Sequence, residues 1–141
     1  MKKVMIAMLA LAETMSPQNR TNNDQDRKDD TSTKSTEYAI RATLEIRDAM
    51  LDPTAFTLLQ VVAITKQEKN GRTSFKGCVH YVGSTRAGGR LQAWGGYSVD
   101  KRNRLNSWPG GENGYCSVSR TDVQTDVTNE VKKFLSASPP R

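Results

Sequence analysis

Apolar side chains are concentrated in two parts of the chain, residues 1–12 and residues 36–135. Residues 13–35 lie between them and carry no aliphatic or aromatic side chain beyond Met15. A segment of this composition cannot bury enough surface to offset its ordering entropy, so we expect a disordered linker there. Residues 136–141 form a polar tail. The pattern therefore predicts a single domain of about 100 residues with one modest core.

The domain begins with a helical pattern. Ile40 and Leu44 lie on one face at the helical period, and Thr36 is suited to be the N-cap. Asp52-Pro53 ends the pattern, because the residue before a proline disfavours the helical region. We expect a helix from Thr36 to Leu51.

Strand patterns follow. Ala55 to Thr65 is rich in β-branched residues and apolar on both faces, which is typical of a central strand. The charged segment Lys66–Arg72 contains Asn70-Gly71, a strong turn dipeptide, and Thr73 to Val82 predicts the return strand. The next part is less regular. We expect a long glycine-rich loop over Gly83–Gly96, or a loop with a distorted edge segment, and then a strand at Tyr97–Val99 and a charged turn at Asp100–Arg104. An irregular segment over Leu105–Tyr115 and a short strand at Tyr115–Val118 are expected to follow.

A second helical pattern closes the domain. Thr121 and Gln124 have the spacing of a capping box, and Val123, Val127 and Val131 follow at helical intervals. The order of elements predicts an α+β fold, with an antiparallel sheet of three to four strands packed by an N-terminal and a C-terminal helix.

The start of the chain has the layout of a bacterial secretory signal. The basic Lys2-Lys3 precedes the apolar run Val4–Leu9, and Ala10-Leu11-Ala12 is a small-x-small cleavage site. Because the apolar run is short, a terminal strand or a frayed helix is the alternative. We expect cleavage after Ala12 and a periplasmic or secreted location. The run is far too short for a transmembrane segment.

The formal net charge is +6, and removal of Lys2 and Lys3 with the signal leaves +4. This mildly basic balance favours loose contact with anionic surfaces but falls short of what is typical of a nucleic-acid binder. In an oxidising compartment, the only two cysteines, Cys78 and Cys116, predict one disulfide. The alternative is two buried free thiols.

No pattern in the chain indicates catalysis, a metal site or a cofactor. Cys78 and His80 project from one face of a predicted strand, but they stand side by side and no third group is visible to orient the imidazole. With Cys116 they supply only three zinc ligands, where a structural site needs four. We therefore predict a non-enzymatic domain with no cofactor.

The best candidate for binding is the glycine-rich segment and its neighbours. Its arginines can pair with carboxylate or phosphate groups, and nearby aromatic rings can stack on sugars or bases. The alternative is a flexible loop whose aromatic residues pack over the sheet edge. The candidate residues are Arg86, Arg90, Trp94, Tyr97, Arg102 and Arg104.

From Arg47 onward the chain resembles small exported bacterial proteins of unknown function. The resemblance is carried by Asp52-Pro53 at a helix end, by Gly77-Cys78 in a strand and by Gly95-Gly96-Tyr97 before another strand. This sequence departs from their pattern, because Gly77 precedes the cysteine and the segment from Gly83 to Trp94 is longer. The resemblance implies export and a compact α+β fold, and it implies no activity.

The sequence leaves two functions open. The first is binding of a protein or an envelope component through the glycine- and arginine-rich loop and the sheet edge. The second is electrostatic binding of an anionic polymer: nucleic acid, which is not favoured, teichoic acid or acidic polysaccharide. A small hydrolase is a third class, and His80 is the only histidine that could serve it as a base.

Overall fold

A computed structural model describes residues 30–111, 119 and 121–140. The predicted signal (residues 1–12), Cys116 and the strand predicted at Tyr115–Val118 lie outside the described residues. Contacts divide the chain into two compact units, Met1–Lys34 and Ser35–Arg141. The described end of the first unit is helical, and Lys34 there forms an ion pair with Asp30 at 3.9 Å.

The second unit contains a helix, a sheet and a second helix. An N-terminal helix covers residues 30–48 of the chain, so its part in this unit runs from residue 35. The other elements are the 3-10 helix η1 (Pro53–Ala55) and the strands and helix β1 (Thr57–Gln67), β2 (Thr73–Ser84), β3 (Arg90–Val99), β4 (Leu105–Gly111), β5 (Val123–Asp126) and α2 (Thr128–Ala137).

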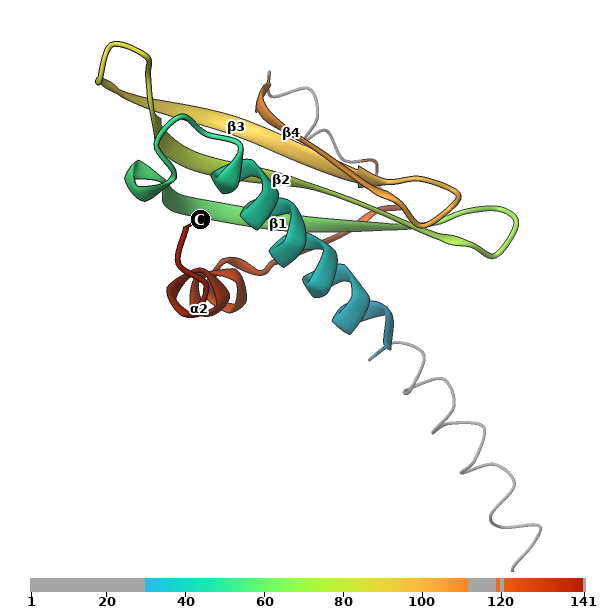
Figure 1. Ribbon diagram of the computed structural model, residues 1–141. Helices are drawn as coiled ribbons and strands as arrows, with labels where there is room; N and C mark the ends of the chain where they lie inside the picture. The colour runs from blue at the N-terminus through green and yellow to red at the C-terminus, as the bar shows by residue number, and fades with distance from the viewer. Residues whose placement is uncertain (1–29, 112–118, 120, 141) are drawn as a thin grey trace, which may run out of the picture. The chain divides into compact units, whose positions relative to one another are not determined.

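The strands form one antiparallel sheet in the order β4-β3-β2-β1-β5. Both helices lie against the same face of this sheet (Figure 1). Buried side chains from the two helices and from the three central strands meet there in one core, for example Ile46, Val79 and Val131. The α+β class is confirmed, and the predicted three to four strands are corrected to five.

The region predicted as a loop over Gly83–Gly96 is mostly strand. β2 continues to Ser84 and β3 begins at Arg90, so only a short turn separates them. The glycines in β3 are tolerated because neighbouring side chains fill the space above them. A methyl group at Gly95 would lie 2.8 Å from the backbone carbonyl oxygen of Trp108 and 3.1 Å from Ile46 Cδ1, and one at Gly96 would lie 2.8 Å from the indole of Trp108. The segment from Leu105 to Gly111, predicted as irregular, forms β4.

The predicted helix boundaries are also corrected. The N-terminal helix includes residues 30–35, so Thr36 lies inside it, and it ends at residue 48. At the other end of the domain, the segment Val123–Asp126 pairs with β1, and α2 begins only at Thr128. Asp126, not Thr121, supplies the first side-chain acceptor, because its Oδ1 accepts a hydrogen bond from the Thr128 backbone N–H at 3.0 Å.

The glycines and the tyrosine noted in the sequence have a packing role; they are Gly77 and Gly95-Gly96-Tyr97. Gly77 of β2 is paired with Tyr97 of β3, and the Tyr97 ring lies flat over it. The ring is only 1% exposed and belongs to the core beneath the helices. Glycine is required at position 77 because any Cβ there would overlap the ring.

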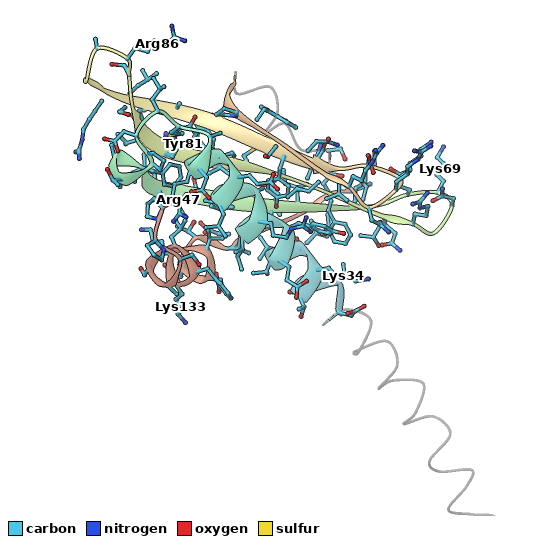
Figure 2. The ribbon with its side chains drawn as sticks, in the orientation of Figure 1. Lys34, Arg47, Lys69, Tyr81, Arg86 and Lys133 are labelled. Carbon is cyan, nitrogen blue, oxygen red and sulfur yellow. The ribbon has the colours of Figure 1, made fainter. Side chains whose placement is uncertain are left out.

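Arg47 joins the two helices. It is 5% exposed, and its Nη1 donates a hydrogen bond to the Ser138 carbonyl just beyond α2, while its Nε contacts Asp48 Oδ1 at 3.1 Å. Figure 2 shows Arg47 between the N-terminal helix and α2. A guanidinium at this position satisfies a carbonyl that the helix end leaves without an intrahelical partner. In the described part of the chain, no helix is long and apolar enough to cross a bilayer.

Candidate functional site

The three hairpins of the meander have the same turn. In each, the backbone N–H of the fourth turn residue donates to the first residue's carbonyl, and the fourth residue has a positive φ: Gly71 at 81°, Gly88 at 83° and Asn103 at 62°. This is the three-residue hairpin loop that ends in a left-handed bulge residue, for which glycine and asparagine are suited. Because the backbone holds these turns, most of their side chains are left free to face solvent.

The order of the strands decides which turns are neighbours. The β1–β2 and β3–β4 turns lie at one end of the sheet, and the β2–β3 turn lies at the other, about 33 Å away along β3. Lys69 and Arg86, labelled in Figure 2, mark these opposite ends. The end that carries residues 66–72 and 100–104 is called the twin-hairpin end below.

A direct contact joins the two turns of the twin-hairpin end. Arg72 Nη2 in the first turn donates a hydrogen bond of 2.8 Å to the Lys101 carbonyl in the second. Between them lies a hollow of about 260 Å³. Phe75 and Val99 are half-buried within it, and exposed polar and charged side chains from both turns surround them.

Positive charge gathers at this end. Residues 66–72 and 100–104 contain six cations and two carboxylates, so the excess is four positive charges. All six cations are exposed. The side chains of Lys69, Lys101 and Arg102 form no hydrogen bond or ion pair among themselves or with other described residues. The six are Lys66, Lys69, Arg72, Lys101, Arg102 and Arg104.

One of the two carboxylates is already committed to the turn. Asp100 Oδ1 accepts the backbone N–H groups of Arg102 and Arg104, each at 2.9 Å, and Oδ2 accepts Arg104 Nε at 3.0 Å. These bonds, the Arg104 N–H first among them, lower the pKa of Asp100. Arg104 is therefore partly neutralised, whereas Glu68 is the carboxylate that remains exposed beside the hollow.

The six residues predicted to bind do not form one surface. Arg102 and Arg104 belong to the twin-hairpin end, and Arg86 and Arg90 are exposed at the opposite end. Tyr97 is buried in the core, so its prediction as a binding residue is wrong. Because Gly77 has no side chain, the Tyr97 ring can occupy the space above it inside the core.

The aromatic ring of Trp94 stacks on His80 across β2 and β3. The ring centroids are 4.1 Å apart and the planes are within 2° of parallel. Cys78 lies two residues along the same strand and is 1% exposed. No cluster of three metal-ligating side chains is found in the described ranges. Because Cys116 is outside them, its disulfide with Cys78 stays a prediction.

Sequence reasoning missed Lys66, Lys69 and Arg72 as site residues. They were identified only as part of a charged hairpin loop; Lys69 and Arg72 do lie in the turn, whereas Lys66 belongs to β1. The signal that could have found them is the alternation of a meander: its first and third turns lie at the same end, so two charged turns separated by one hairpin become neighbours.

Comparison of the chain with protein families, with curated proteins and with solved structures finds no match. The function has to be inferred from the arrangement of its own residues.

Proposed function

We propose that this chain is a non-enzymatic binding domain that holds an anionic polymer through the twin-hairpin end. The observation that carries the proposal is the excess of four positive charges at the twin-hairpin end, where two turns and the end of β1 lie together. A polymer with regularly spaced negative charges can contact several of these cations at once and release its counterions, which gives affinity without a deep pocket.

Three of the six cations are not needed to hold the two turns. The turns are closed by backbone hydrogen bonds and by Asp100, and Lys69, Lys101 and Arg102 make no side-chain bond to other described residues. Like charges this close repel one another, so their gathering on a compact end has an electrostatic cost that an anionic partner removes.

The surface offers little for reading bases. Binding of single-stranded nucleic acid generally uses aromatic rings on which bases stack. The ring in the hollow, Phe75, is half-buried and packs against Tyr38 with a centroid distance of 5.2 Å. Charge, not base stacking, therefore supports the binding. Binding through the β2–β3 turn is less well supported, because Arg86 and Arg90 are remote from the other cations.

Charge reversal at matched positions tests the proposal. The double variant Lys69→Glu/Lys101→Glu changes one cation on each turn of the twin-hairpin end. The control Arg86→Glu/Arg90→Glu changes the net charge equally at the opposite end. At low salt, we expect the first variant to weaken binding to a uronate polymer at least 30-fold, at about 1 kcal/mol for each cation removed. We expect the control to change it less than about 3-fold.

The salt dependence gives a second measurement. Titrations at several salt concentrations should show log affinity falling linearly with log salt for the unmodified chain, and a smaller slope for Lys69→Glu/Lys101→Glu. Equal losses in the two charge-matched variants would show that net charge alone matters and would reject the twin-hairpin end as the site.

A further inference from the structure

The hollow at the twin-hairpin end is not lined only by cations. Its wall includes the uncharged amides of Asn70 and Asn103, the hydroxyl of Ser74 and the carboxylates of Glu68 and Asp100. Phe75 and Val99 add an apolar surface. Amide N–H groups and hydroxyls can also donate to a phosphate, so the features that indicate more than negative charge are the Glu68 carboxylate, which only accepts hydrogen bonds, and the apolar surface.

We infer that the polymer held here is an acidic polysaccharide, with one carboxylated sugar ring seated in the hollow. This inference rests on the proposed function. A uronate ring presents a carboxylate, several hydroxyls and an apolar face of C–H groups. Arg72 and Lys101 suit the carboxylate. The Arg72 guanidinium donates to the Lys101 carbonyl through Nη2 and has further N–H groups to donate, and the Lys101 ammonium makes no bond to another described side chain.

The hydroxyls of the sugar have partners in the same hollow. Glu68 accepts hydrogen bonds only, Asn103 can both donate and accept, and the two groups lie on opposite turns. Asn70 uses its Oδ1 to accept the Arg72 backbone N–H at 3.0 Å, which leaves its N–H groups to donate. The apolar ring face can lie against Phe75.

The hollow is small. Its volume of about 260 Å³ lies just below the range of roughly 300–1,000 Å³ typical of pockets for drug-sized ligands. Neighbouring sugars would extend over the exposed cations on either side.

Glu68 separates sugar from other anionic polymers. It repels a phosphate or a simple carboxylate, whereas a sugar hydroxyl donates a hydrogen bond to it. Asp100 does not make this distinction, because three donors from its own turn already occupy its oxygens.

The test compares three probes at one ionic strength: polygalacturonate, polyglutamate and polyphosphate of similar charge number. Polyglutamate supplies carboxylates without sugar rings. We expect Glu68→Ala to weaken binding to polygalacturonate about 10-fold, since a hydrogen bond to a charged acceptor is lost. The same variant should strengthen binding to the other two probes. Asn103→Gly, which keeps a residue that tolerates positive φ, should weaken only polygalacturonate binding, about 3-fold.

The outcomes separate the two proposals. If none of the probes binds, the proposed function fails. If all three bind and Glu68→Ala strengthens each of them, the proposed function stands and the polysaccharide inference is overturned. Unfolding midpoints in urea, measured for each variant, must match the parent chain before the affinities are compared.

Discussion

Substitution of Gly77 by alanine tests the packing that fixes the centre of the sheet. The new Cβ would lie closer than 3.0 Å to three atoms of the Tyr97 side chain, two of the ring and the hydroxyl oxygen, a distance that real Cβ atoms essentially never show. The ring cannot move freely, because it is 1% exposed and enclosed between the sheet and the helices. One of the two residues must therefore shift.

The expected loss of stability follows from two opposing effects. Overpacking of a core costs about 1–3 kcal/mol. Alanine offsets part of this, because glycine in a strand is roughly 0.5–1 kcal/mol less favourable than alanine. If Tyr97 is displaced entirely, the loss approaches the roughly 3–5 kcal/mol of a core aromatic truncation. From the middle of these ranges, the net loss is about 1 kcal/mol if Tyr97 only shifts and about 3 kcal/mol if it is displaced. We therefore expect the free energy of unfolding to fall by about 1–3 kcal/mol, measured by urea unfolding.

A control and a rescue make this prediction specific. Gly89→Ala introduces the same methyl group on the exposed β2–β3 turn, where the nearest atom is the Thr85 hydroxyl at 3.3 Å, and should change stability by less than about 0.5 kcal/mol. Adding Tyr97→Leu to Gly77→Ala should cost less than the sum of the two single changes. Wild-type stability in Gly77→Ala would refute the account of the glycine.

Three further predictions concern stability. Tyr97→Phe removes a buried hydroxyl that has no hydrogen-bond partner in the described ranges, so urea unfolding should show unchanged stability or a gain of about 1 kcal/mol; a loss would reveal a missed partner. Arg47→Met leaves the Ser138 carbonyl without its donor and should cost about 1–3 kcal/mol, with Arg41→Met, on an exposed residue of the same helix, as the control. Hydrogen bonds lower the pKa of Asp100, Asp122 and Asp126, so their stabilisation is present above the unfolded pKa of about 3.9 and is lost as the pH falls further. Unfolding midpoints measured between pH 6 and pH 2 should decline, and Asp100→Asn should reduce that decline.

Local patterns predicted those parts of the fold that local chemistry determines. Asn70-Gly71 predicted the first hairpin, and Gly71 does adopt the positive φ that the turn needs. Asp52-Pro53 marked the region in which the helix ends, although its last residue is 48, about a turn earlier. Asp52 itself caps η1 by accepting the Thr54 N–H.

The errors arose where a distant segment decides the structure. Val123, Val127 and Val131 have helical spacing, yet the edge of β1 pairs with Val123–Asp126 and makes a strand of it. Val123 is 61% exposed as a result, whereas Val127 and Val131 remain in the core. Gly95 and Gly96 suggested a loop because glycine has no side chain that could contribute to packing. The side chains that fill their space come from the N-terminal helix and from β4.

The candidate site belongs to this second kind of feature. Its two turns, residues 66–72 and 100–104, were each predicted correctly as charged turns, but each alone is an ordinary solvated hairpin end. They become one surface only because β2 and β3 return the chain to the same end of the sheet, where Arg72 reaches the Lys101 carbonyl. The same strand order removes Arg86 and Arg90 from that surface. Charge along the sequence therefore predicted which residues are exposed. The order of the strands decides which of these charges can act on one ligand.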